Sequence, residues 1–106
     1  MEASEARRRR PAIVAVDDEP AVLAAVARDL RRGFGERFRV VRAQSGDEAL
    51  EVVRELVARG EQVALLIADQ RMPGLSGTEY LVQARQLVPN AKRVLLTAYA
   101  DTEAAI

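Results

Sequence analysis

The sequence contains no cysteine, no histidine and no tryptophan among its 106 residues. Without cysteine there are no disulfides or thiolate metal sites. Without histidine there is no imidazole acid–base chemistry, no histidine zinc site and no phosphohistidine relay within this chain. Aromatic residues make up only 4% of the chain, but hydrophobic residues reach 49%. This composition suits one globular domain, and the chain is too short for a second core.

An excess of charge of either sign is also missing, because 16 basic residues balance 16 acidic ones. This balance argues against nucleic-acid binding by the body of the domain. The basic residues are concentrated only locally, in the run Arg7–Arg10. We predict that residues 1–11 form a disordered basic N-terminal arm and that residues 12–106 form the folded domain.

Long hydrophobic runs are absent as well. The longest, Val63–Ala68, falls far short of the roughly 20 residues that span a membrane. The run behind the arginines, Ala12–Val16, is shorter than a signal-peptide core of about 7–15 apolar residues. We therefore expect a cytoplasmic protein that makes no contact with a membrane.

Short apolar runs alternate with helical patterns along the chain. The runs predict strands at 12–16, 38–43, 63–68 and 94–96. Pro20 opens the first helix, and the capping boxes that start at Ser45 and Ser76 open the next two. Helical spacing puts Val22 and Val57 on the buried faces of the first two helices, and Tyr80 beside the buried face of the third. This alternation predicts an α/β fold, a doubly wound parallel sheet with strand order 2-1-3-4.

The fourth predicted strand is as apolar as the first and third, so we expect it to be internal, with another strand on its far side. No residues remain in this sequence to supply that strand. We expect the natural protein to continue beyond Ile106, with a fifth strand and a last helix that this chain lacks. An exposed apolar sheet edge favours self-association, so a homodimer is left open.

Three carboxylates follow strands that this topology places side by side. Asp17 and Asp18 come after the first strand and Asp69 after the third, so all three should meet at the carboxyl ends of the strands. Each pair of charges at 4 Å repels by about 4 kcal/mol at an effective dielectric of 20. A hard cation, Mg²⁺ or Mn²⁺, would relieve this repulsion and leave Asp69 as a nucleophile. Thr97, after the fourth strand, places a hydroxyl at the same edge.

Each of these residues also has a purely structural interpretation. An acidic pair after a strand is commonly a polar loop that caps the next helix, and only the combination with Asp69 and Thr97 favours a site. Ser45 and Ser76 are capping residues, to which we assign no chemistry. Lys92, the only lysine, precedes the fourth strand and should lie at the opposite end of the sheet.

The motifs that carry these residues are Val16–Pro20, Ala68–Gly74 followed by Gly77, and Leu95–Ala98. Together, in this order and spacing, they resemble the response-regulator receiver domains of bacterial two-component systems, which have the flavodoxin-like order 2-1-3-4-5. The resemblance implies that Asp69 is the phosphoacceptor. It also implies a metal site made by Asp17, Asp18, Asp69 and the backbone carbonyl of Arg71.

The same resemblance implies further roles near the fourth strand. Thr97 would be the switch hydroxyl, and the backbone amide of Ala98 would contact the phosphate. Arg71 and Tyr99 occupy the two variable positions that tune dephosphorylation in this family. The family's conserved lysine and aromatic switch residue belong to the fifth strand, so neither role is assigned here.

The implied function is a switch that takes a phosphoryl group from a sensor histidine kinase, a phosphotransfer protein or a small phosphodonor. It relays this event to an output domain C-terminal to the chain or to a separate protein. Similar motifs occur in receivers joined to HD-type cyclic-dinucleotide phosphodiesterases and to thioredoxin-reductase-like flavoproteins. Two alternatives remain: a magnesium-dependent phosphohydrolase, which would lack a general acid at Arg71, and a degenerate receiver that only binds partners.

Overall fold

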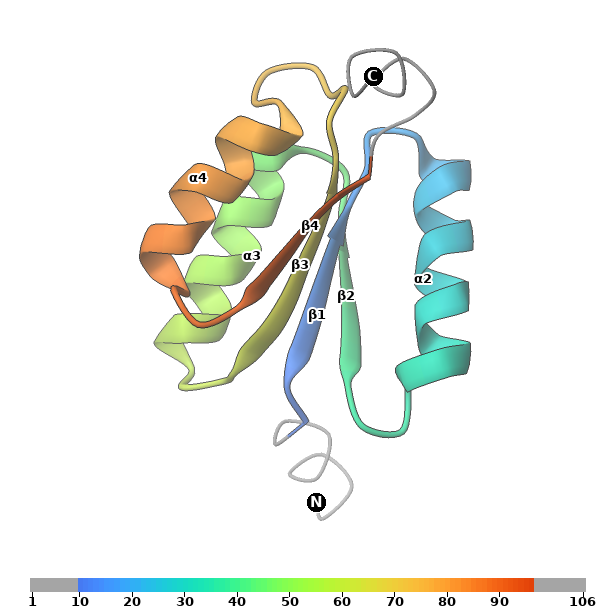
Figure 1. The fold of residues 1–106 in the computed structure, drawn as a ribbon, viewed down its shortest axis with the longest axis vertical. Coiled ribbons are helices and arrows are strands. Elements are labelled where there is room, and N and C mark those ends of the chain that lie inside the picture. Colours follow the sequence, from blue (N-terminus) through green and yellow to red (C-terminus); the bar gives the residue numbers. More distant parts are fainter. Residues whose placement is uncertain (1–9, 97–106) are drawn as a thin grey trace, which may run out of the picture.

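The computed structural model describes residues 10–96, which form four strands and three helices (Figure 1). The elements in chain order are β1 (Ala12–Val16), α2 (Pro20–Phe34), β2 (Arg39–Ala43), α3 (Gly46–Ala58), β3 (Val63–Asp69), α4 (Gly77–Leu87) and β4 (Lys92–Leu96). Every strand therefore alternates with a helix, as the sequence predicts. None of the helices within residues 10–96 has the length and apolar content of a membrane span.

The four strands form one parallel sheet in the order β2-β1-β3-β4. Helix α2 covers one face, whereas α3 and α4 cover the other (Figure 1). This arrangement confirms the doubly wound, flavodoxin-like fold. The order of strands reverses between β1 and β3, and in such sheets ligands bind outside the carboxyl ends of the strands at that point.

The buried core is centred on β1, which is buried along its whole length between β2 and β3. One residue on each of the three helices differs from the burial predicted for it. Val22 and Val57, expected to be buried, are 40% and 44% exposed. Tyr80, expected to flank the buried face of its helix, is instead fully buried. The reason is the rotation of α4: Gly77, Tyr80 and Ala84 face inward, because their spacing puts them on one side of a helix.

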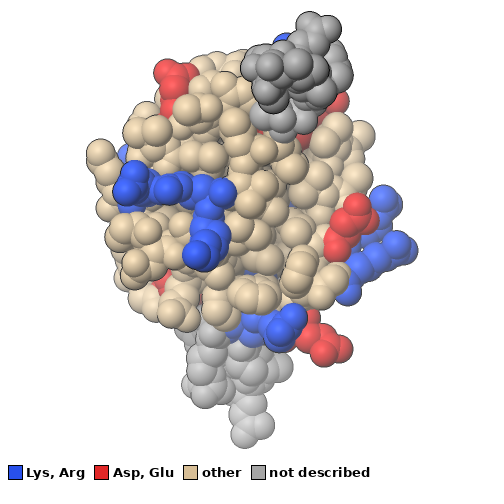
Figure 2. Space-filling view, viewed as in Figure 1, with Lys and Arg blue, Asp and Glu red and all other residues tan. Residues whose placement is uncertain are grey.

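Strand β4 lies at the edge of the sheet within the described residues, and most of its residues are exposed. Lys92 is its first residue rather than a residue before it, because it pairs with Leu65 of β3. Val94 and Leu96 are 40% and 39% exposed. Figure 2 views the molecule from this edge and shows a mostly uncharged surface. The predicted fifth strand, which would make β4 internal, stays a prediction.

Candidate metal centre

The three carboxylates predicted from the topology do converge. Asp17 and Asp18 follow β1, and Asp69 is the last residue of β3. Each offers one carboxylate oxygen, and these oxygens all lie within 4.8 Å of one another. The parallel register explains this convergence, because Val16 at the end of β1 pairs with Ala68 just before Asp69.

Asp17 is the most deeply placed of the three, only 6% exposed. Its backbone N–H donates to the carbonyl oxygen of Ala43 (3.2 Å). Its Oδ1 accepts a hydrogen bond from the Glu19 N–H (2.9 Å). Burial raises the pKa of the Asp17 carboxyl; the hydrogen bond from Glu19 opposes this shift, and repulsion by Asp69 and Asp18 adds to it. A buried carboxylate beside two others is a group that a cation would stabilise.

The donor set fits a hard divalent cation. All three candidate donor atoms are carboxylate oxygens, and the chain has no histidine or cysteine to favour a softer metal. Mg²⁺ is commonly held by one or two carboxylates together with waters and phosphate oxygens. Asp18 and Asp69 are partly exposed, so the cluster is open to solvent on their side. The geometry therefore fits Mg²⁺ or Mn²⁺ with coordination positions left for a ligand.

The backbone around Asp69 is tightly packed against the start of α4. A Cβ atom added to Gly77 would lie 2.4 Å from the Asp69 carbonyl oxygen and 2.7 Å from Cδ1 of Leu95. Any side chain at this position would push the helix away from the strand end. Only glycine therefore allows α4 to begin so close to the third carboxylate.

The loop after Asp69 turns at Gly74, whose φ of 77° favours glycine. Its Met72 is buried, whereas Arg71 is exposed. The loop ends in the predicted capping box. Ser76 Oγ accepts a hydrogen bond from the Glu79 N–H (3.1 Å), and the Glu79 carboxylate accepts one from the Ser76 N–H (3.0 Å). The hydrogen bond from the Ser76 backbone N–H, and after it the contact with the Ser76 side chain, lower the pKa of the Glu79 carboxyl. Ser76 is thus a capping residue, as the sequence predicts.

Several predicted site residues stay predictions. The Arg71 carbonyl is not shown to be a metal ligand, and Thr97, Ala98 and Tyr99 lie outside the described residues. Gln70, in contrast, was missed by the sequence reasoning. Its side chain accepts two hydrogen bonds from Thr78, eight residues further on. No local pattern in the sequence signals a contact across that loop.

The family model for the response regulator receiver domain matches residues 13–106. The chain belongs to this family. Receiver domains are the phosphoacceptor switches of two-component systems, and Mg²⁺ bound at an acidic pocket and phosphoaspartate are typical of them. The resemblance found in the sequence is thereby confirmed at the level of the family.

Relatives of known sequence or structure agree with this assignment. The hydrogenase transcriptional regulatory protein HoxA of Cupriavidus necator is 38% identical over 95 residues, which cover 90% of this chain and 18% of HoxA. The Thermotoga maritima response regulator TrrA, solved with Mg²⁺ and BeF, is 31% identical, with a TM-score of 0.69 over 91% of this chain and 76% of TrrA.

A third similar protein is a Burkholderia pseudomallei response regulator whose structure contains a phosphorylated aspartic acid and a calcium ion. It is 26% identical, with a TM-score of 0.68 over 85% of this chain and 48% of the other. The chain spans less than a fifth of the curated relatives from Cupriavidus necator and Bradyrhizobium diazoefficiens, 18% and 17% of their lengths. The activities of those longer proteins are therefore not assigned to it here.

Proposed function

We propose that this chain is a Mg²⁺-dependent phosphorylation switch in which Asp69 accepts the phosphoryl group. The observation that carries the proposal is the convergence of Asp17, Asp18 and Asp69 at the carboxyl end of the sheet in a chain of the receiver family. Asp17 is an unsuitable nucleophile, because it is buried and one of its oxygens accepts the Glu19 N–H. Asp69 is partly exposed and ends β3, the position that matches the family's acceptor.

In the transfer step, an Asp69 carboxylate oxygen attacks the phosphorus of the donor. A new P–O bond forms as the P–N bond of a phosphohistidine, or the P–O bond of acetyl phosphate, breaks. The electron pair of the broken bond stays with the leaving imidazole, which takes up a proton from water, or with the leaving acetate. The product is an acyl phosphate on Asp69.

Asp17 and Asp18 would hold the cation beside Asp69, with the Arg71 carbonyl as a further ligand. When bound, Mg²⁺ neutralises the negative charge that gathers on the phosphoryl oxygens. The protein's contribution is to fix the two anchoring carboxylates. The Glu19 N–H holds the Asp17 carboxylate in place, and its burial keeps that side chain from rotating into solvent.

The switch would act through the end of β4. The carbonyl oxygen of Leu96 accepts a hydrogen bond from the Gln70 N–H (3.3 Å), so the chain leaves β4 beside the acceptor loop. Thr97 follows Leu96 directly, and we assign it the hydroxyl that bonds the phosphoryl group, with the Ala98 amide as a second donor. Movement of this segment toward the acyl phosphate would carry the signal onward.

Arg71 and Tyr99 would set the lifetime of the acyl phosphate, because their bulk shields it from water. A doubly substituted variant, Arg71→Ala with Tyr99→Ala, should lose phosphate faster than the wild type. Dephosphorylation at an unchanged rate, followed by intact mass, would refute this assignment.

The partners implied are a sensor histidine kinase or phosphotransfer protein as donor and an output domain or separate protein as receiver of the signal. Among the relatives, HoxA is a transcriptional regulatory protein and CckA of Brucella abortus is a sensor kinase. Self-association through the β4 edge is a further proposal, supported by the exposure of Val94 and Leu96. The location we propose is cytoplasmic.

The first experiment adds acetyl phosphate and Mg²⁺ to the 106-residue chain and measures its intact mass, with Asp69→Asn as the matched control. We expect the wild type to gain the mass of one phosphoryl group and the control to gain none. A folded, Mg²⁺-binding sample that gains nothing would favour a receiver that serves only as an interaction module. A gain that survives in Asp69→Asn would place the acceptor elsewhere.

A further inference from the structure

Gln70, the residue directly after Asp69, connects three elements through four hydrogen bonds. Its backbone N–H donates to the Leu96 carbonyl oxygen at the end of β4 (3.3 Å), and its carbonyl oxygen accepts from the Gly77 N–H at the start of α4 (3.1 Å). Its side-chain Oε1 accepts from both the N–H (2.9 Å) and the Oγ1–H (2.7 Å) of Thr78. The end of β3 is thus tied to β4 and to the first turn of α4.

The side-chain bonds do more than cap a helix. Ser76 already closes a complete capping box with Glu79. Gln70 reaches back across the whole loop from a position eight residues before Thr78. It takes the N–H of the second residue of α4, which has no partner inside the helix. A residue outside the helix therefore completes its N-terminus, and this contact fixes the loop between them.

The contact holds a closely packed junction. Gly77 lies against the Asp69 backbone so tightly that a Cβ would come within 2.4 Å of the Asp69 carbonyl oxygen. A shift of α4 relative to Gln70 would therefore displace the backbone that carries the Asp69 carboxylate. It would also displace Arg71, which lies in the loop between Gln70 and Gly77.

We propose that Gln70 is a positioning residue for phosphoryl transfer. Its side chain, held by Thr78, fixes the Asp69 carboxylate and the loop that carries the Arg71 carbonyl where Mg²⁺ and the phosphoryl group are received. This inference rests on the proposed function of Asp69. Gln70 acts only through these neighbours and is given no contact with the cation or the phosphoryl group.

The test uses three variants of the full chain. Gln70→Met keeps the length of the side chain but removes the Oε1 acceptor, Thr78→Ser keeps both donors, and Gln83→Met makes the same chemical change at an exposed position of α4. Mg²⁺ affinity is measured by calorimetry, and the rate of phosphate gain from acetyl phosphate by intact mass at subsaturating Mg²⁺. Thermal denaturation of each variant is measured first, and all assays are then run at a temperature at which every variant is folded.

Loss of a residue that orients metal ligands typically lowers affinity or activity about 10–100-fold. We expect Gln70→Met to lower Mg²⁺ affinity and phosphorylation rate by about 10-fold, at the low end of that range. Thr78→Ser and Gln83→Met should keep a Mg²⁺ affinity and a phosphorylation rate close to those of the wild type. The double variant Gln70→Met with Thr78→Val should lose little more than Gln70→Met alone, because both changes break the same contact.

A Gln70→Met variant with a lower melting temperature but wild-type affinity and rate would overturn the proposal and leave Gln70 a purely structural residue. If the wild type binds Mg²⁺ but gains no phosphate, the acceptor role of Asp69 fails. The affinity comparison then still decides the positioning role. A wild type that binds no Mg²⁺ would overturn both.

Discussion

Asparagine at position 17 would isolate the electrostatic cost of the carboxylate cluster. The Asp17→Asn side chain has nearly the same shape, and its Oδ1 can still accept the Glu19 N–H that Asp17 accepts at 2.9 Å. Only the charge is removed. We expect the variant to be more stable than the wild type without divalent cations and to respond far less to Mg²⁺.

The magnitude follows from the geometry. The oxygens of the cluster lie within 4.8 Å of one another, and two unit charges at that distance repel by about 3.5 kcal/mol at an effective dielectric of 20. Asp17 has two such neighbours, Asp18 and Asp69. Both are partly exposed, so solvent screens much of the repulsion, and we expect a net gain of about 1–2 kcal/mol in the free energy of unfolding.

The assay is urea denaturation of both proteins in EDTA and in Mg²⁺. A ligand at 100 times its dissociation constant stabilises the folded state by about 2.7 kcal/mol. Mg²⁺ should therefore raise the free energy of unfolding of the wild type by an amount of this order. Asp17→Asn should gain much less. The control Asp29→Asn removes a charge at an exposed position of α2 and should change stability by less than about 0.5 kcal/mol in either condition.

Two results would refute the reasoning. In the first, Asp17→Asn is less stable than the wild type in EDTA, which would mean that the charge at this position stabilises the fold. In the second, Mg²⁺ stabilises both proteins equally, which would place the cation away from Asp17.

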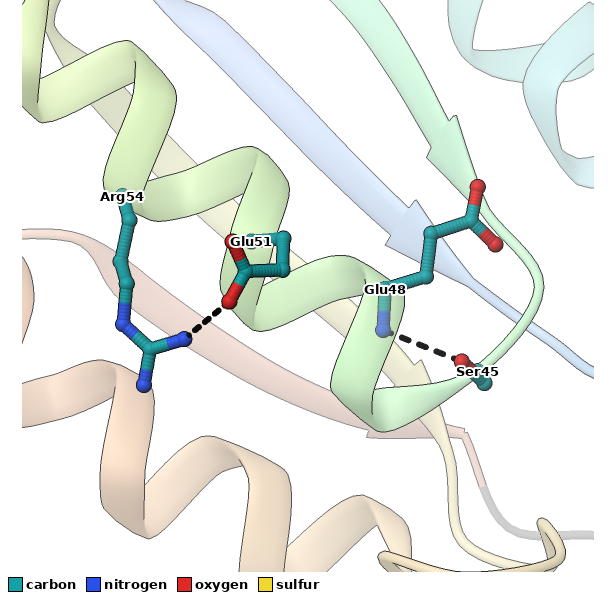
Figure 3. Close-up of polar contacts among 4 residues, drawn as sticks. All are labelled: Ser45, Glu48, Glu51 and Arg54. Atoms are coloured by element: carbon teal, nitrogen blue, oxygen red, sulfur yellow. Dashed lines mark hydrogen bonds and ion pairs between the residues drawn. The ribbon is translucent and has the colours of Figure 1, made fainter.

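Three further predictions concern the surroundings of the site. Tyr80 is fully buried, its hydroxyl has no hydrogen-bond partner among the described residues, and burial raises its pKa. The unfolded chain therefore loses this proton first, above a pKa of about 10, and stability falls as the pH rises further. Between pH 9 and 11 the free energy of unfolding of the wild type, measured by urea denaturation, should fall by about 1.4 kcal/mol more than that of Tyr80→Phe. Equal losses in the two proteins would contradict this. Gly77→Ala, whose Cβ would lie 2.4 Å from the Asp69 carbonyl oxygen, should cost about 1–3 kcal/mol in thermal denaturation, and a neutral result would contradict the close packing. Figure 3 shows the Ser45 hydroxyl accepting the Glu48 N–H (3.0 Å) and the exposed Arg54–Glu51 ion pair (2.7 Å); Ser45→Ala should cost about 1 kcal/mol and Arg54→Ala less than about 0.5, and the reverse order would contradict this.

The fold was predictable because its signals are local and repeated. Fully apolar runs such as Ala12–Val16 indicate strands covered on both faces. The N-cap bond of Ser45 and the full capping box of Ser76 mark helix starts by hydrogen bonds that span three residues, although Glu48 accepts from the Gln44 N–H and so does not complete the box predicted at Ser45. Lys92 lies at the end of the sheet opposite the carboxylates, as predicted, but β4 begins at this residue and not after it. This boundary and the inward position of Tyr80 were not predicted, because the limits of an edge strand and the rotation of a helix depend on partners that lie elsewhere in the chain.

The candidate site was predictable for a topological reason. Parallel strands present their carboxyl ends at one edge, so Asp17, Asp18 and Asp69 had to meet once the strand order was known. The roles of Thr97 and Tyr99 were drawn from the family resemblance and stay predictions, because these residues lie outside the described part of the chain.

The sequence by itself determined the order of strands and helices along the chain and the edge of the sheet at which the carboxylates gather. Hydrophobic periodicity and helix capping depend on residues that are close together in the sequence. Only the tertiary structure decided which carboxylate is buried, how closely Gly77 approaches Asp69, and that Gln70 bonds Thr78 across the loop. These features depend on distances between elements, which are set by the packing of helix against sheet and by no single stretch of sequence.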